Sequence, residues 1–254
     1  MGEEKNSLFL YVITQIKLIK KMKKNFKDFR NFYRSVNPYQ MTSFDDRVNK
    51  PKNTISPYIV KEAELNMSQQ DIFSHLLENR IIFFGDEFNS ETCNIAIGEI
   101  LFLNQQDEEK DIDIYINSPG GNITDLFGLL GTIGAVKNDI STTAIGMAAS
   151  CANLLLTAGA RGKRKALPLA KLLCHQPMGG VRGQQSDIEI EANFIKELKE
   201  DICNIYMNAT GLDHDDVWSR MDRNNWVRPE KALANNKGGE WGKYGMIDKI
   251  ITKI

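Results

Sequence analysis

Residues 111–150 read DIDIYINSPGGNITDLFGLLGTIGAVKNDISTTAIGMAAS, and this stretch decides the fold. It opens with isoleucines at positions 112, 114 and 116, the two-residue period of a β-strand with one buried face. The turn SPGG then leads into a helix predicted over residues 123–136, and a second strand, ISTTAIGMA, runs into Ser150. Strand and helix patterns that alternate in this way predict an α/β domain of parallel βαβ units.

The same alternation continues on both sides of this stretch. Upstream, DIFSHLLENR has a helical pattern, IIFFG predicts a short buried strand, and residues 92–104 predict a second helix. The apolar positions of that second helix are Ile95, Ile97, Ile100, Leu101 and Leu103. Downstream we expect one strand over residues 164–174 and the longest helix over 186–209. A final strand, MIDKIITKI, follows the Gly-rich segment 235–243, which we interpret as a loop insertion without an assigned role.

Composition and charge exclude several classes of function. Apolar residues make up 42% of the chain and charged residues 26%, which is typical of a globular protein with a real core. The net charge of -1 gives no case for a nucleic-acid partner, and no apolar run approaches the roughly 18 residues of a membrane-spanning helix. No nucleotide-binding loop of the form GxxxxGK[ST] occurs, and we predict no cofactor.

The cysteines indicate buried thiols in a reducing compartment. Cys93, Cys151, Cys174 and Cys203 are widely spaced and form no CxxC pair. This spacing argues against a disulfide framework and against a zinc site, so we predict no metal.

Residues 1–56 lack a steady period, and we separate them from a domain over 57–254. Between Lys17 and Arg34 the chain carries eight basic residues and one acid, Asp28. Two interpretations remain open: a targeting leader, or a disordered extension without a function. The leader pattern and the Lys/Asn-heavy composition favour an organelle, a plastid of the apicoplast type before a mitochondrion.

Three turns place chemically useful groups at the ends of successive strands. His175 ends one strand, and the carboxyl ends of strands in α/β sheets converge on ligand-binding crevices. Ser150 lies at a strand-to-helix turn, where a hydroxyl is exposed beside free N–H groups. Gly120 and Gly121 let the backbone approach a substrate closely. Each also has an ordinary explanation: a structural histidine, a helix N-cap serine and a tight turn. The ordered set of three favours a serine–histidine site.

Three long segments, INSPGGNIT, GMAASCANLLLTAGARGKR and CHQPMGGVRGQQSDIEIEA, resemble the signature regions of ClpP-type serine peptidases. The similarity extends from about residue 68 to residue 254. It implies a crotonase/ClpP-like fold of repeated β-β-α units, with residues 186–209 as a protruding handle helix. It also implies rings of seven subunits that degrade unfolded proteins delivered by a Clp-family AAA+ ATPase.

The same resemblance assigns the site residues. Ser150 corresponds to the family's nucleophile and His175 to its general base. The backbone N–H groups of Gly121 and Cys151 correspond to the oxyanion hole. Cys151 itself is a weak alternative nucleophile because adjacent side chains at a turn point in different directions, and Cys174 is better explained as a buried apolar thiol.

The triad acid is where this sequence departs from the family. The family's Asp-Arg-Asp run reads Asp222-Arg223-Asn224 here, so the triad aspartate falls on Asn224. Asp222 and Arg223, which serve the contact between rings, are kept. The amide oxygen of Asn224 can still orient His175, but it cannot stabilise the imidazolium charge. In another serine protease the same change lowers kcat about 10⁴-fold, or roughly 5–6 kcal/mol of barrier.

Other departures concern the docking surface and the turn behind the nucleophile. Asp113 and Ala135 stand where family members carry aromatic residues, so we expect weaker docking of the ATPase. Ala152 replaces a glycine, and Asn153 replaces a small or apolar residue, so we expect crowding behind Ser150.

Two main hypotheses about function follow. The first is a catalytically weak or noncatalytic subunit of the ClpR type, in a homo-heptamer or in a mixed ring with an active ClpP sister. The alternative is an active serine endopeptidase that uses the Ser150-His175-Asn224 set. A crotonase-type acyl-CoA enzyme is a weaker alternative, because the match is to peptidase motifs rather than to the fold alone.

Overall fold

A computed structural model describes residues 58–63, 66–234 and 240–254. The predicted leader over residues 1–56 and five residues of the predicted insertion, 235–239, lie outside this part of the chain. Among the described helices, none combines the length and the apolar composition that a membrane crossing requires. The described chain opens with an antiparallel pair, β1 (Tyr58–Ala63) and β2 (Asn66–Asp71), which leads directly into α4 (Ile72–Glu78).

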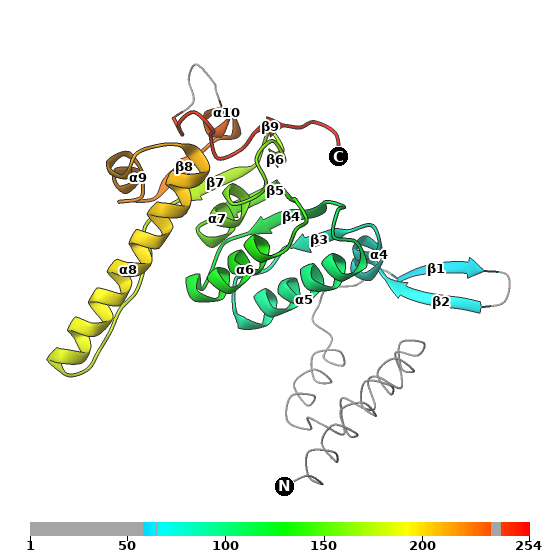
Figure 1. The fold of residues 1–254 in the computed structure, drawn as a ribbon, viewed down its shortest axis with the longest axis horizontal. Helices are drawn as coiled ribbons and strands as arrows, with labels where there is room; N and C mark the ends of the chain where they lie inside the picture. Colours follow the sequence, from blue (N-terminus) through cyan, green and yellow to red (C-terminus); the bar gives the residue numbers. More distant parts are fainter. Residues whose placement is uncertain (1–57, 64–65, 235–239) are drawn as a thin grey trace, which may run out of the picture. The chain divides into compact units, whose positions relative to one another are not determined.

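A sheet of seven strands forms the centre of the domain (Figure 1). Six of its strands are parallel: five lie in the order β3-β4-β5-β6-β9, and β7 pairs with the end of β5. Their bounds are β3 Ile81–Phe84, β4 Ile112–Ser118, β5 Ile140–Ala149, β6 Arg164–Ala166 and β9 Lys249–Ile250. The strand β7 (Lys171–Cys174) pairs with the last residues of β5, and β8 (Asn225–Val227) pairs antiparallel with β7. The predicted α/β fold is confirmed.

Three helices follow the strands β3, β4 and β5 in turn: α5 (Ser90–Gln106), α6 (Ile123–Ala135) and α7 (Cys151–Thr157). The helix α6 packs between α5 and α7, and α7 packs against β5. The helix α5 begins two residues before the predicted start because Asn89 and Thr92 form a capping box there. The strand β4 contributes Ile112, Ile114 and Ile116 to the core, as its alternation predicted. Every residue of α7 is buried, so the helix after Ser150 is enclosed by the domain.

The helix α8 (Gln185–Thr210) projects away from the sheet (Figure 1) and corresponds to the predicted handle helix. Its first half is exposed, whereas Leu198, Ile202 and Tyr206 near its end are buried in the core. It ends at Gly211, whose φ of +75° is the left-handed conformation of a helix C-cap. Two short helices, α9 (His214–Arg220) and α10 (Pro229–Ala232), follow.

Two sequence predictions need correction, and the predicted loop insertion contains a buried side chain. The single strand predicted over residues 164–174 is two strands, because the turn at residues 167–170 contains Pro168, which lacks a backbone N–H for pairing. The predicted final strand is reduced to the two residues of β9, which pair with β6, itself three residues long. Within the predicted loop insertion, Trp241 is 0% exposed and packs against Tyr206, with ring centroids 5.6 Å apart.

Candidate active site

Ser150 occupies a sharp turn between β5 and α7. Its backbone has φ +55° and ψ −119°, a region that residues other than glycine rarely adopt. Its N–H donates to the Leu173 carbonyl oxygen at 2.9 Å, which ties the turn to β7. The Ser150 side chain makes no capping hydrogen bond to α7, and its Oγ lies 2.8 Å from His175 Nε2. The N-cap explanation of this side chain is therefore wrong.

His175 follows directly after β7 and contacts both predicted partners. Its Nε2 faces Ser150 Oγ, and its Nδ1 lies 3.0 Å from Asn224 Oδ1. An amide oxygen can only accept a hydrogen bond, so this contact places the ring proton on Nδ1. The lone pair of Nε2 is then free to take the proton of the Ser150 hydroxyl. The structure brings together all three residues of the predicted set.

Gln176 positions the segment that carries Asn224, and the sequence analysis missed it. Its backbone N–H donates to the Met221 carbonyl oxygen at 2.7 Å, and its side-chain Nε2 donates to the Asp222 carbonyl oxygen at 2.7 Å. These bonds join residues that are more than forty positions apart in the chain. Its position immediately after His175 was the one feature of the sequence that could have indicated this role.

Asp222 and Arg223 lie on the surface beside the site. Arg223 Nη1 is 3.5 Å from Asp222 Oδ2, and both side chains are exposed. Their predicted role between rings stays a prediction. Across the sheet, Asp113 Oδ1 lies 3.4 Å from Lys165 Nζ, so an ion pair occupies the position where the resemblance implied an aromatic ring.

The backbone opposite Ser150 provides the donors of an oxyanion hole. Gly120 has φ +98°, and a Cβ there would lie 2.6 Å from the Ala149 carbonyl oxygen and 2.7 Å from Ser150 Cβ. The turn SPGG therefore packs against the nucleophile as closely as glycine allows. In the described residues, the N–H groups of Gly121 and Cys151 donate to no backbone carbonyl oxygen. They remain available for a negatively charged oxygen.

The cysteines next to the site are poor nucleophiles. Cys151 Sγ donates to the Gly121 carbonyl oxygen at 3.1 Å, and burial raises the pKa of this thiol to about 11. Burial also raises the pKa of Cys174 to about 12. Because the reactive form is the thiolate, both thiols are protonated and unreactive near neutral pH. The alternative in which Cys151 replaces Ser150 is not supported.

A cavity of about 380 Å³ opens beside Ser150 and His175. Its walls combine polar and apolar groups, and the apolar side chains come from α6, α7, α8 and the loop after His175: Ile123, Leu154, Met178, Phe194, Leu198, Ile202 and Tyr206. Such a cavity suits an apolar side chain next to a scissile bond. In the part of the chain that is described, no group of three His, Cys, Asp or Glu side chains could hold a metal ion.

Asn153 does not crowd the nucleophile, contrary to the sequence expectation. It is fully buried in α7, and its Nδ2 donates to Tyr206 Oη at 3.0 Å. Tyr206 is itself 1% exposed and forms part of the cavity wall. The substituted position therefore links the nucleophile helix to the handle helix rather than pressing on Ser150.

Comparison with known proteins points to one family. The family model described as Clp protease matches residues 63–254. The ATP-dependent Clp protease proteolytic subunit of Bacteroides fragilis is 42% identical over 209 residues, which cover 82% of this chain and 97% of that protein. The corresponding subunit of Porphyromonas gingivalis is 40% identical over 211 residues, or 83% of this chain and 91% of that protein. The matched region includes every residue of the site.

Proposed function

This chain belongs to the Clp protease family, and from that premise we propose that it is a slow serine peptidase subunit of an ATP-dependent Clp complex. The observation that carries the proposal is the hydrogen-bonded set Ser150-His175-Asn224, with contacts of 2.8 and 3.0 Å. A set held at these distances can transfer a proton. The uncharged amide of Asn224 limits how fast it does so.

The geometry supports acyl transfer in the following steps. Ser150 Oγ attacks the scissile carbonyl carbon while His175 Nε2 accepts the hydroxyl proton. The carbonyl oxygen gains negative charge and accepts hydrogen bonds from the N–H groups of Gly121 and Cys151. His175 then gives its proton to the leaving amine, and water releases the acyl group by the same route. Asn224 holds the ring in place throughout but contributes no opposing charge to the imidazolium.

For assembly, we propose a ring of seven subunits, either of this chain alone or mixed with an active sister. Family membership supports ring assembly with Clp ATPases and protein substrates. The Asp113–Lys165 ion pair and the small, exposed Ala135 would give a more polar docking surface for the ATPase. We propose weak docking as the consequence. Native mass spectrometry of the purified protein, with and without a sister subunit, would measure the ring composition.

For location, we propose an organelle, with residues 1–56 as a removable leader. The basic stretch from Lys17 to Arg34 supports this proposal. Sequencing the first residues of the protein isolated from its cells would test it. A mature chain that begins near residue 57 is the expected result, and an intact Met1 would contradict the leader.

Hydrolysis of a fluorogenic peptide with an apolar side chain before the scissile bond tests the peptidase function. We expect slow turnover by the wild-type protein, none by Ser150→Ala, and none by His175→Ala. All three proteins should be compared in the same oligomeric state. A wild-type rate equal to that of Ser150→Ala would contradict slow catalysis and favour a noncatalytic subunit.

A further inference from the structure

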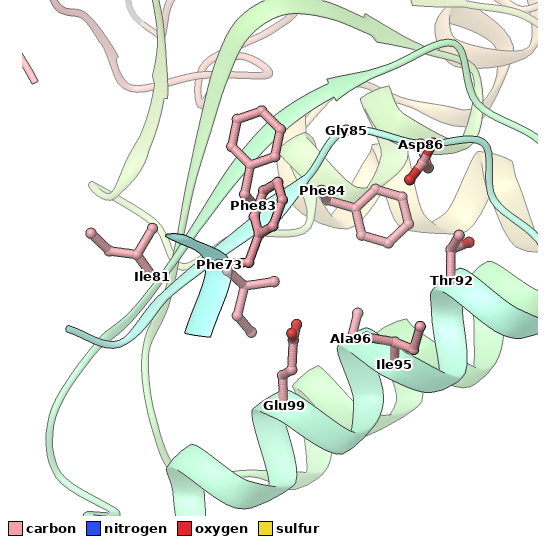
Figure 2. Close-up of a pocket in the computed structure, with 11 residues that line it drawn as sticks. Phe73, Ile81, Phe83, Phe84, Gly85, Asp86, Thr92, Ile95, Ala96 and Glu99 are labelled. Atoms are coloured by element: carbon pink, nitrogen blue, oxygen red, sulfur yellow. The ribbon is translucent and has the colours of Figure 1, made fainter. Parts of the chain in front are cut away.

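A second cavity, of about 270 Å³, lies between α4, β3 and α5 (Figure 2). It shares no lining residue with the cavity beside Ser150. Its walls are mostly apolar, with Phe73, Phe83 and Ile95 among them, and the carboxyl group of Glu99 points from α5 into the space between them (Figure 2). Sites for small molecules usually measure roughly 300–1,000 Å³. A cavity of this size suits a single side chain.

Glu99 has no partner for its charge among the described residues. No ion pair or hydrogen bond reaches its carboxyl group there, and burial alone raises its pKa, to about 7. Placing a carboxylate in apolar surroundings without a partner is costly. A positive group in this cavity would offset that cost.

Exposed apolar side chains lie on the same surface as this carboxyl group. Ile95, Glu99 and Phe102 follow one another at helical spacing and share one face of α5. Ile95 is 54% exposed and Phe102 48%, and Phe73 on α4 is 51% exposed. The neighbouring strand β3 is the edge of the sheet, so no further described strand covers it. Clustered exposed apolar side chains of this kind mark a protein–protein contact.

We propose that this cavity is a socket for a lysine or arginine side chain of a second copy of this chain. The apolar walls would take the methylene stem of that side chain, and Glu99 would pair with its charged end. The rings of Phe73 and Phe83 can add cation–π attraction. A second copy is the favoured partner because the similar proteins are named as subunits and the apolar surface extends beyond the cavity along α5. The inference rests on the proposed subunit function.

Assembly measured by sedimentation velocity over a range of protein concentrations tests the socket. Glu99→Lys places a like charge in the socket, and we expect the concentration for half-assembly to rise at least tenfold. Glu99→Leu, which keeps the apolar volume, should also weaken assembly if the socket holds a cation. Glu109→Lys makes the same charge change at an exposed position outside the cavity and should assemble like the wild type. Near-ultraviolet circular dichroism would check that each variant folds.

The possible outcomes separate this proposal from the peptidase function. Assembly of Glu99→Leu as tight as the wild type would show an apolar contact without a cation and would overturn the socket. Normal assembly of Glu99→Lys with loss of capture by a purified Clp ATPase would also overturn it, and would assign the cavity to that partner. Wild-type protein that stays monomeric on its own would overturn the socket, and a wild type that also fails to join a ring with a sister subunit would overturn the subunit function as well. Assembly lost through Glu99→Lys supports the socket whether or not the site hydrolyses peptides.

Discussion

Replacing Asn224 by aspartate is predicted to speed peptide hydrolysis by placing a negative charge beside His175. Asparagine and aspartate have the same shape, and His175 Nδ1 already lies 3.0 Å from Asn224 Oδ1. A carboxylate therefore fits without rearrangement. Unit charges about 4 Å apart attract by about 4 kcal/mol at an effective dielectric constant near 20, and by about 1 kcal/mol in bulk water. Asn224 is exposed, so we expect a value between these limits.

That range corresponds to a gain of about 5-fold to about 1,000-fold, at 1.36 kcal/mol for each factor of ten. This gain is smaller than the roughly 10⁴-fold effect known for a buried triad acid, because the side chain at position 224 is exposed and water screens its charge. The gain should be in kcat, with KM little changed, because the imidazolium charge develops in the transition state.

Steady-state hydrolysis of a fluorogenic peptide by the wild type and by Asn224→Asp measures this effect. Asn224→Ala, which removes the acceptor for His175 Nδ1, should fall below the wild type. The double variant Ser150→Ala/Asn224→Asp should be inactive. An Asn224→Asp protein that is no faster than the wild type, in the same oligomeric state, would refute the role of charge at this position.

Three further predictions concern stability and can be checked by urea denaturation. Tyr206→Phe should lower the free energy of unfolding by about 1–3 kcal/mol because it removes the hydroxyl oxygen that accepts a hydrogen bond from the buried Asn153 amide. The double variant Tyr206→Phe/Asn153→Ala should lose less stability than the sum of the losses in the two single variants. Losses that simply add would contradict an energetic contact between the two side chains. Asp248→Asn should cost roughly 3–5 kcal/mol because Arg164, 1% exposed, would lose the carboxylate that lies 2.8 Å away. Burial raises the pKa of Asp248, but hydrogen bonds from Arg164 outweigh burial and lower the pKa overall. The wild type therefore loses the stabilisation by this ion pair at acid pH, as Asp248 becomes protonated. An Asp248→Asn protein as stable as the wild type at pH 7 would contradict the prediction. The wild type should lose stability as the pH rises from 4.5 to about 7, because the folded subunit binds more protons than the unfolded chain in this range. Glu99→Gln should not show this loss. In the dissociated subunit the variant should gain roughly 1–2 kcal/mol at pH 8 after allowance for solvent screening, and an unchanged pH dependence would contradict this.

The sequence predicted the elements of the fold better than the faces they bury. The helical period of α5 is correct, but both faces of that helix carry apolar residues. Ile100 lies in the core, whereas Ile95 and Leu101 are about half exposed. Periodicity finds a helix but cannot tell a core face from a surface kept apolar for a partner. Similarly, the single apolar Trp241 within a polar, Gly-rich segment gave no periodic signal, although it is fully buried.

The reacting groups were predictable because each follows a strand of the same sheet. Ser150 and His175 follow directly after β5 and β7, which pair with each other, so their turns must meet. The supporting contacts were not predictable in the same way. Gln176 reaches a carbonyl group 46 positions away, and Asn153 contacts a residue 53 positions away. Nothing in the local sequence specifies such pairs, because they depend on how separate elements pack.

Covalent labelling by a fluorophosphonate probe tests most directly whether Ser150 is an activated nucleophile. The wild-type protein, Ser150→Ala and Asn224→Asp would be incubated with the probe, and the modified peptide would be identified by mass spectrometry. We predict slow labelling of the wild type at Ser150, faster labelling of Asn224→Asp, and none of Ser150→Ala. No labelling of the wild type over many hours, with labelling restored by Asn224→Asp, would contradict slow catalysis and would show an intact scaffold silenced at one position.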